Sequence, residues 1–320
     1  MRMAVTMGDP AGVGPEIIVK ALKQKEYLNE TIVYGSAEVL QYYIDLLKAD
    51  LKIRIIEQAE EAQDDHLNVI EPRQLSLKDF EIGKLSAACG DMAFQCLKRA
   101  VEDAVADKVS AIVTAPLNKE AMNLAGHHYD GHTGAIMHLL NDDHCRMVLW
   151  SDKLKVIHVT THVALRKACD LCTRERVEET IRIAAELLKR SGNAHPHIAV
   201  AGLNPHAGEN GLFGDEEIRQ IIPAIKQCCA EGLQVSGPLP PDTAFLRASQ
   251  GEFDMVVAMY HDQGHIPLKM LDFGSGVNIS AGLKILRTSV DHGTAFDIAG
   301  KGIASEESMI SALEAAEKLL

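Results

Sequence analysis

Three of the fourteen histidines in this 320-residue chain stand where a shared metal ion could bind. His162, His206 and His261 each follow a short apolar, strand-like run and lie among small or polar residues. The carboxyl ends of parallel strands line the ligand crevice of α/β sheets, and imidazoles gathered there can share one divalent cation and leave positions open for substrate oxygens. Their separations of 44 and 55 residues match no local metal motif. Spacing alone therefore leaves a metal site and a polar or capping role both open.

A second group of polar residues could bind an anion. His132 and Thr133 combine an imidazole, a hydroxyl and backbone amides at the expected start of a helix. Lys269, Asn278 and Arg287 stand in otherwise apolar, strand-like surroundings. A cation in such a run either extends to the surface along its aliphatic stem or points into a cleft to meet carboxylate or phosphate. Both interpretations stay open at this point.

The glycine-rich turn at residues 8–16 is a candidate cofactor contact. It follows the expected first strand and leads into a helix, because Pro15 suits a first helical turn. Ile17 stands where the dinucleotide fingerprint needs glycine, and no Gly-Lys-Ser/Thr follows, so a Rossmann loop and a P-loop are both excluded. Gly12 and Gly14 could still approach a cofactor edge, as could His292 in the later Asp-His-Gly-Thr run.

Short strand-like runs alternate with helical patterns, which predicts an α/β fold with a mostly parallel sheet buried between helices. The clearest helical pattern has Thr173 as a plausible N-cap, apolar residues at 4-3-4 spacing from Val177, and Gly192 as a stop. No flexible linker interrupts the pattern, so two domains would have to be joined by ordered crossings. The predicted strands cover residues 3–7, 31–35, 111–115, 147–150, 155–161, 197–202, 255–260 and 277–281.

Composition excludes several classes of protein. Hydrophobic residues make up 47% and charged residues 24%, which argues against disordered, collagen-like and coiled-coil chains. The net charge of −13 disfavours nucleic acid as a partner. No apolar run approaches the ~20 residues of a membrane span, and the N-terminus has no signal-peptide core. Of seven cysteines, only Cys169 and Cys172 form a CxxC pair. We therefore expect a cytoplasmic protein with no membrane partner and reduced cysteines.

Taken together, these motifs resemble the 4-hydroxythreonine-4-phosphate dehydrogenase (PdxA) family from end to end. The resemblance is specific because many long motifs occur in one order. Besides the turn at 8–16 it rests on Thr-Ala-Pro at 114–116, Gly-His-Thr at 131–133, Thr-His at 161–162, Gly-Leu-Asn-Pro-His-Ala-Gly-Glu at 202–209, Tyr-His-Asp-Gln-Gly at 260–264, Gly-Val-Asn-Ile at 276–279 and Arg-Thr-Ser-Val-Asp-His-Gly-Thr-Ala at 287–295.

The resemblance implies a fold of two α/β/α domains, similar to isocitrate and isopropylmalate dehydrogenases, with the active site in the interdomain cleft. The first domain would hold residues 1–120 with 262–320, and the second, with the dimer interface, residues 121–261. It further implies NAD bound without the Rossmann fingerprint, and a homodimer whose active sites draw residues from both subunits.

The resemblance also implies a role for each candidate residue. The cofactors would be NAD and one divalent metal ion, which could be zinc, magnesium, manganese or cobalt. The metal would assist oxidation at C3 of a small phosphorylated hydroxy acid and the loss of carbon dioxide that follows. The implied metal ligands are His162, His206 and His261; the substrate-binding residues are His132, Thr133, Lys269, Asn278 and Arg287; the candidate catalytic residues are Lys269 and Asp242; and the candidate cofactor contacts are Gly12, Gly14 and His292.

Three runs, at 115–120, 240–243 and 264–269, resemble the branch that converts 4-phospho-D-threonate or 4-phospho-D-erythronate to dihydroxyacetone phosphate and carbon dioxide. One alternative is the dehydrogenase of 4-hydroxy-L-threonine 4-phosphate in pyridoxal phosphate (vitamin B6) biosynthesis. Another is a metal-dependent lyase or hydrolase on a phosphorylated sugar acid, which would need Asp242, Asp262 or Asp291 as its base. A non-catalytic sensor is disfavoured, because a sensor has no need of an open-sided metal.

Overall fold

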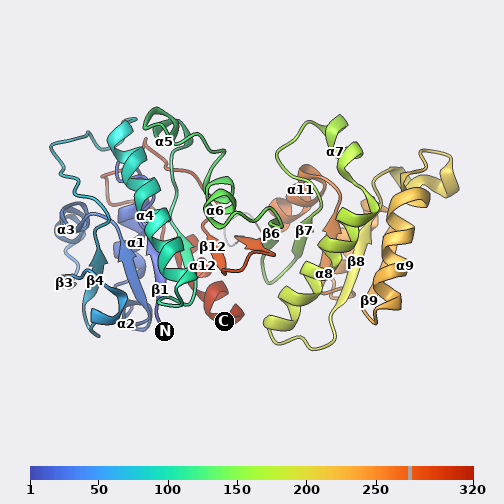
Figure 1. The fold of residues 1–320 in the computed structure, drawn as a ribbon, viewed down its shortest axis with the longest axis horizontal. Helices are drawn as coiled ribbons and strands as arrows, with labels where there is room; N and C mark the ends of the chain where they lie inside the picture. The colour runs from blue at the N-terminus through green and yellow to red at the C-terminus, as the bar shows by residue number, and fades with distance from the viewer. Residues whose placement is uncertain (273–275) are drawn as a thin grey trace. The chain divides into compact units, whose positions relative to one another are not determined.

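The computed structural model describes residues 1–272 and 276–320, which divide into two compact units (Figure 1). Unit 1 comprises Met1–Cys145, Leu283–Lys318 and Leu320, and unit 2 comprises Arg146–Gly282 and Leu319. The chain thus crosses between the units near residues 145 and 282, whereas the resemblance implied boundaries at 120 and 261. Segments after residue 120 stay with unit 1 because they pack on one of its helices, as described below.

Unit 1 contains a parallel sheet in the order β3-β4-β2-β1-β5-β12. Every residue of its four central strands, and of β12 at its edge, is buried. Burial on both faces requires cover on both faces, which parallel sheets obtain from the helices that connect their strands. The strands are β3 (Ile53–Ile55), β4 (Leu67–Ile70), β2 (Thr31–Tyr34), β1 (Met3–Thr6), β5 (Ile112–Thr114) and β12 (Arg287–Ser289).

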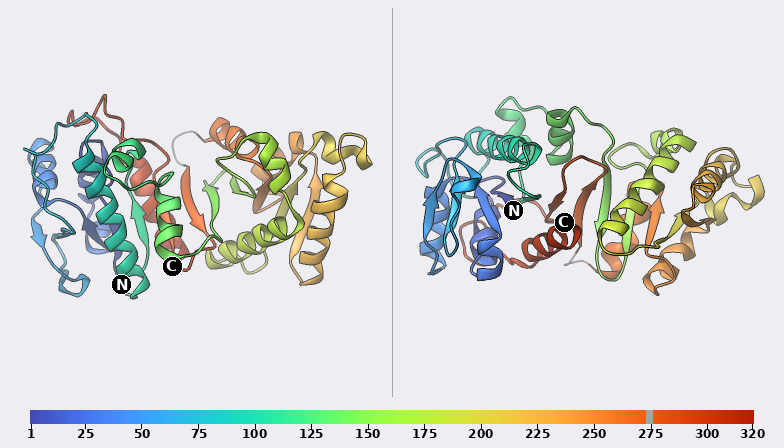
Figure 2. Two further views of the ribbon diagram at one scale, coloured as in Figure 1. Left: turned by 45° about the horizontal axis from the view of Figure 1, so that its top comes forward. Right: turned by 60° about the horizontal axis from the view of Figure 1, so that its bottom comes forward.

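Seven helices belong to unit 1, and the longest of them organises its core. This helix, α4, presents Met92, Cys96 and Leu97 to the sheet, while α5 and α6 pack on it through Met122 and Ile136. Figure 2 shows the red C-terminal helix α12 returning to the blue and teal elements of this unit. The helices are α1 (Gly14–Ala21), α2 (Lys25–Asn29), α3 (Ala37–Leu46), α4 (Ala87–Val105), α5 (Lys119–Leu124), α6 (His132–Leu140) and α12 (Glu307–Leu319).

Unit 2 contains a mixed sheet in the order β11-β6-β7-β10-β8-β9. The pairs β11-β6 and β6-β7 are antiparallel, whereas β7, β10, β8 and β9 run parallel to one another. The carboxyl ends of these four strands therefore lie at one edge. The strands are β11 (Val277–Ala281), β6 (Arg146–Trp150), β7 (Lys155–His158), β10 (Met255–Ala258), β8 (His197–Ala201) and β9 (Gln234–Leu239).

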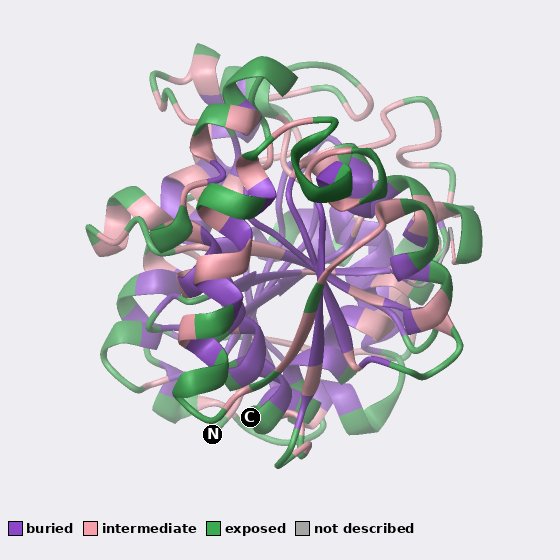
Figure 3. Cartoon of the chain, turned by 90° about the vertical axis from the view of Figure 1, so that its right-hand side faces the viewer, coloured by how far each residue is buried: buried purple, intermediate pink, exposed green. Residues whose placement is uncertain are grey.

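The helices of unit 2 cover this sheet, so that its strands are mostly purple in Figure 3 and the outward helical turns are green. Helix α8 begins as predicted, because the Thr173 hydroxyl accepts a hydrogen bond from the amide of Arg176. A π-helical turn at Glu217–Ile221 leads directly into α9. The helices are α7 (Leu165–Leu171), α8 (Arg174–Arg190), α9 (Ile222–Ala230), α10 (Pro241–Ser249) and α11 (His261–Leu271).

All eight predicted strands are confirmed, as are the strand-like surroundings of Arg287, which lies in β12; β3, β4 and β9 were not predicted. One local prediction is wrong: Lys269 lies in the last turn of α11, not in strand-like surroundings. Pro267, inside that helix, had made the segment look extended, but the apolar contact of Leu268 with the core holds it helical. Among the described helices, none is both long and apolar enough to cross a membrane.

Candidate functional site

Three neighbouring strands of unit 2 each end close to one of the predicted metal ligands. Strands β7, β10 and β8 are adjacent and parallel, and they are followed by His162, His261 and His206 respectively. The parallel direction brings these three strand ends to the same edge of the sheet, where ligands bind in α/β proteins. The expected strand-end position of the three histidines is therefore present in the structure.

His162 and His261 lie beside each other, with ring centroids 5.5 Å apart. His261 is the first residue of α11, and its Nδ1 lies 2.7 Å from a carboxylate oxygen of Asp262. A carboxylate accepts from an imidazole N–H, so this contact favours the tautomer with the proton on Nδ1 and the lone pair on Nε2. Carboxylates orient metal-binding histidines in the same way. Nε2 of His261 is thus prepared to coordinate a cation.

Two further histidines that the sequence did not single out lie against His261. The His265 ring stacks on it at 3.6 Å with an interplanar angle of 12°, and His158 is 4.9 Å from His265. His158 is buried and its Nδ1 donates to the Met147 carbonyl, while Nε2 has no partner among the described residues. Burial, together with the nearby charge of His265, lowers the pKa of His158 to about 3, which keeps its ring neutral. The four-residue spacing of His261 and His265 is a signal only once the segment is known to be helical.

His206 lies in a turn with an unusual backbone. Residues 206–210 all have positive φ, at 53°, 56°, 79°, 45° and 56°, and only Gly208 among them is glycine. Left-handed conformation costs an L-residue roughly 1–2 kcal/mol. Four non-glycine residues in that region within one five-residue turn persist only where surrounding contacts hold them, and such strain is concentrated at functional sites.

The contacts that hold this turn come from Glu217, which is buried. Its Oε1 accepts from the amides of Leu203 and Asn204, at 2.8 and 2.7 Å, and its Oε2 accepts from the Asn204 side-chain amide at 2.9 Å. Gly208 is required here, because a Cβ at that position would come 2.7 Å from the same carboxylate. No sequence pattern distinguishes Glu217 from the many surface acids of this chain.

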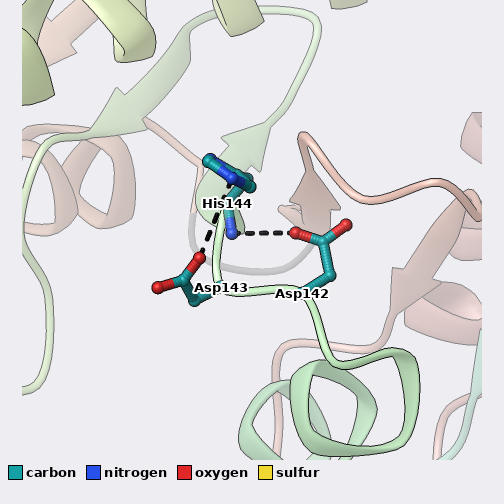
Figure 4. A group of neighbouring side chains, drawn as sticks. All are labelled: Asp142, Asp143 and His144. Carbon is teal, nitrogen blue, oxygen red and sulfur yellow. Dashed lines mark hydrogen bonds and ion pairs between the residues drawn. The ribbon is translucent and has the colours of Figure 1, made fainter.

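Among the described residues, His162, His206 and His261 do not form a group whose ligand atoms all lie within 4.8 Å of one another. Among residues 1–272 and 276–320, one group of three metal-binding side chains has its ligand atoms within 4.8 Å of one another, and it is Asp142, Asp143 and His144 (Figure 4). That group lies on the loop after α6, where His144 donates its backbone amide to Asp142 and approaches Asp143 at 3.8 Å. Acidic loop residues of this kind are ordinary surface features and carry no site.

Unit 1 contains a separate pocket of about 210 Å³ suited to an anion. Its lining includes His132 and Gly131, at the N-terminus of α6, and Lys119, at the start of α5. No side chain caps α6, so its first backbone N–H groups are available to a ligand. Lys119 was not predicted as a site residue, because nothing in its spacing connects it with His132.

Two cations lie at or near this pocket: Lys119 lines it, and Arg287 is close enough to His132 to affect its pKa. The Arg287 side chain is only 3% exposed, and its Nε and one Nη both donate to the Thr114 hydroxyl, at 3.2 and 2.7 Å. Burial lowers the pKa of Arg287 to about 10, so the guanidinium stays charged at neutral pH. Burial, with the charges of Arg287 and Lys119, lowers the pKa of His132 well below its usual value. Thr133 is half-buried in the first turn of α6.

The remaining predicted substrate and catalytic residues lie in unit 2. Asn278 is half-buried in β11, opposite Leu149 of β6. Lys269 is half-buried on α11, and Asp242 is exposed in the first turn of α10. Asp242 lines a groove between α10 and α11, as does Tyr260.

The candidate cofactor contacts are all in unit 1. Gly12 and Gly14 are buried, and a Cβ at either position would meet the carbonyl oxygen of Thr294 or Met7, at 2.8 and 2.3 Å. His292 is exposed and borders the 210 Å³ pocket. The backbone that fills the space beside Gly12 thus belongs to the segment that carries His292.

Known proteins are similar to this chain in both sequence and fold. The profile of the family described as "Pyridoxal phosphate biosynthetic protein PdxA" matches residues 27–316. D-threonate 4-phosphate dehydrogenase of Salmonella typhimurium is 53% identical over 322 residues, which cover 99% of this chain and 98% of that protein. The solved 4-hydroxythreonine-4-phosphate dehydrogenase of Klebsiella pneumoniae is 50% identical, with a TM-score of 0.89 and 99% of each chain covered.

A distant structure extends the likeness to the fold class. Isocitrate dehydrogenase of Methylococcus capsulatus is 15% identical, with a TM-score of 0.50 over 99% of this chain and 88% of that one, a level that concerns the fold alone. The expected isocitrate dehydrogenase-like α/β fold is confirmed, as is the resemblance from which it was inferred. The family profile matches most of the chain, and the two full-length relatives are 53% and 50% identical to it. Together these findings establish the family. The chain belongs to the PdxA family of dehydrogenases.

Proposed function

We propose that this protein catalyses the NAD- and metal-dependent oxidative decarboxylation of 4-phospho-D-threonate or 4-phospho-D-erythronate. The observation that carries the proposal is the 53% identity, over nearly all of both chains, with a D-threonate 4-phosphate dehydrogenase. The anion pocket of unit 1 and the strand-end histidines of unit 2 supply the two kinds of site that such a substrate requires.

The reaction divides into two balanced steps. In the first, C3 loses a hydride and its hydroxyl loses a proton, which leaves a β-keto acid. In the second, the bond between C1 and C2 breaks, carbon dioxide departs, and C2 takes up a proton to give dihydroxyacetone phosphate. When bound, NAD accepts the hydride, and the divalent cation supplies Lewis acidity at the C3 oxygen. Asp242 and Lys269 are the proposed proton-transfer groups of this chain.

The metal would be held by His162, His206 and His261. Neutral imidazole nitrogens favour zinc, while substrate oxygens leave room for magnesium, manganese or cobalt. The contact of Asp262 with Nδ1 of His261 leaves Nε2 directed to a ligand. His162 and His261 already lie together in one chain. His206, which follows the neighbouring strand β8, is the proposed third ligand.

The phosphate or carboxylate of the substrate would be held by His132, Thr133 and Arg287, with Lys119 as an additional cation. Open N–H groups of a helix, a planar guanidinium and an ammonium favour an anion for the same electrostatic reason. The family resemblance assigns Lys269 and Asn278 to substrate binding as well. His292, beside the pocket, is the proposed NAD contact, while Gly12 and Gly14 let the chain pack beneath it.

Purified protein should form NADH with 4-phospho-D-threonate or 4-phospho-D-erythronate much faster than with 4-hydroxy-L-threonine 4-phosphate. The substrates differ mainly at C2, which carries a hydroxyl in the first two and an amine in the third. NADH formation is followed by absorbance with each substrate, with and without a metal chelator. Chelation should abolish the activity, and adding back a divalent cation should restore it.

Each alternative has its own outcome in this assay. A preference for the amine substrate would instead indicate a 4-hydroxythreonine-4-phosphate dehydrogenase, as the Klebsiella pneumoniae structure is named, and a role in pyridoxal phosphate biosynthesis. Product formation without NADH would indicate a metal-dependent lyase or hydrolase. NADH formation that the chelator does not change would contradict the metal assignment but not the dehydrogenase activity.

A second copy of this chain is the proposed partner. The groove of about 530 Å³ between α10 and α11 is lined by apolar side chains, of which Leu246, Ile266 and Met270 are 58%, 58% and 83% exposed. Large exposed apolar patches mark interaction surfaces. Asp262, next to His261, also lines the groove, so a copy seated in it would lie close to the histidine site.

We expect a dimer in sedimentation at assay concentrations, and we expect Met270→Glu to dissociate it with a large loss of activity. Ile303→Glu is the matched control, because Ile303 is an exposed apolar residue of unit 1. Mixing inactive His261→Ala and Arg287→Met proteins should restore partial activity if the two residues serve a shared site from different chains. A fully active monomer would overturn the dimer.

A further inference from the structure

We propose that Glu217 and Gln263 are positioning residues, which together hold the left-handed turn of His206 at a fixed place relative to His261. The inference rests on the proposed function, because it assigns these two residues a role in metal binding. Neither residue reaches the cation itself. Both act through the backbone of the segments that carry the two ligands.

Glu217 determines the shape of the turn. Its carboxylate accepts three hydrogen bonds from Leu203 and Asn204, the residues that lead into the left-handed stretch. The stretch then closes through the amide of Phe213, which donates to the Gly208 carbonyl at 3.2 Å. A buried carboxylate requires several donors, and it finds them only when the chain adopts this conformation.

Gln263 ties this turn to the segment of His261. The Gln263 amide donates to the Gly202 carbonyl at 2.8 Å, and its carbonyl accepts from the Met259 amide at 2.6 Å. Gly202 follows β8 and Met259 follows β10, so one buried side chain connects the ends of two neighbouring strands. Both of its hydrogen-bonding groups are satisfied, which fixes the side chain in one orientation.

Among the described residues, the ring contact of His206 is with Phe213, whose centroid lies 6.3 Å away and whose amide closes the same turn. The His206 side chain is exposed, and no hydrogen bond to its ring is found among the described residues. The position of its imidazole is therefore set by the backbone of the turn, and the backbone is set by Glu217 and Gln263. Residues that orient a metal ligand typically contribute 10–100-fold to metal affinity.

Cobalt(II) bound to the metal-free dimeric protein gives a direct test, because its visible spectrum reports the number and geometry of its ligands. Glu217→Gln places an amide NH₂ against the Asn204 donor, and Gln263→Met keeps the shape but removes both hydrogen bonds. Each should weaken cobalt binding 10–100-fold and alter the spectrum towards that of His206→Ala. Backbone amide hydrogen exchange of residues 203–211 in the metal-free protein should rise in both variants.

Matched controls make the same chemical changes nearby. Asp215→Asn alters an exposed carboxylate that pairs with Arg219, and Gln250→Met alters an exposed glutamine at the end of α10. Both should bind cobalt within 2-fold of wild type. In a His206→Ala background, Glu217→Gln should weaken cobalt binding less than 2-fold further, because Glu217 acts only through His206; a general loss of structure would weaken it again by the full factor.

The outcomes separate this inference from the proposed function. If wild-type protein binds no cobalt, or if His206→Ala leaves cobalt binding unchanged, both the metal site and the positioning role are wrong. If His206→Ala weakens cobalt binding while Glu217→Gln and Gln263→Met bind normally, or their amide exchange is unchanged, the positioning role alone is wrong.

Discussion

Replacing His261 by Ala is expected to lower kcat/KM for the 4-phospho acid by at least ~1,000-fold, because a metal that assists hydride loss supplies several kcal/mol to the transition state. Metal content measured after dialysis should fall with the activity. His206→Ala should have the same effect, and since His206 is exposed, its loss leaves the core untouched. The melting temperature of the metal-free His206→Ala protein should therefore match that of metal-free wild type.

A graded series strengthens this prediction. Asp262→Asn keeps the ligand but removes the carboxylate that orients it, so a smaller loss of about 10–100-fold in metal affinity is expected. His195→Ala is the control, because His195 is exposed and its side chain makes no hydrogen bond among the described residues. Full chelator-sensitive activity of His206→Ala would mean that this histidine is not a ligand.

Replacing Arg287 by Lys is expected to raise KM for the phosphorylated substrate by about 10–100-fold, the equivalent of one charged hydrogen-bonded contact. Lysine keeps a charge but loses the planar fork that matches phosphate or carboxylate. Its charge would also be held less firmly, because burial already lowers the pKa of Arg287 to about 10 and lysine starts from a lower value. Thr114→Val, which removes the hydroxyl that orients the guanidinium, should raise KM less.

The comparison of KM with thermal stability decides what Arg287 does. An anion-binding role predicts a raised KM with little change in melting temperature. A structural role predicts the reverse, with a lowered melting temperature and an unchanged KM. Lys284→Met is the control for charge alone, because Lys284 is an exposed cation three residues earlier in the same segment. A raised KM in that variant as well would point to long-range attraction of the substrate.

The strands could be predicted because their residues are apolar on both faces. Runs such as 3–7 and 255–260 can be buried on both faces only in a sheet covered by helices. The structure contains β1 and β10 there. Strand β3 was missed because its residues are only partly buried, so that Ile55 is exposed and Arg54 interrupts the apolar run. Its neighbours in the sequence alone suggested that Lys269 belongs to a strand. It is helical because α11 packs against the rest of unit 2.

The sequence predicted which kinds of residue form the site, but it did not identify all of them. Histidines at strand ends, and an arginine among apolar residues, are informative because polar groups in such places must find partners. His158, Lys119 and Glu217 were missed, because each becomes significant only through what lies next to it. Burial of Glu217 beside the His206 turn, for example, depends on a π-helical turn that begins at Glu217 itself, eleven residues after His206.

The sequence by itself determined the fold class, the family and the chemistry available at the strand ends, because these follow from residue type and from order along the chain. The tertiary structure alone decided which polar groups meet. It stacked His265 on His261, oriented Arg287 on Thr114, and forced residues 206–210 into a left-handed turn around Glu217. Hydrogen bonds and ring contacts act over only a few ångströms in space. They can join residues at any separation in the sequence, so the sequence alone does not show which residues meet.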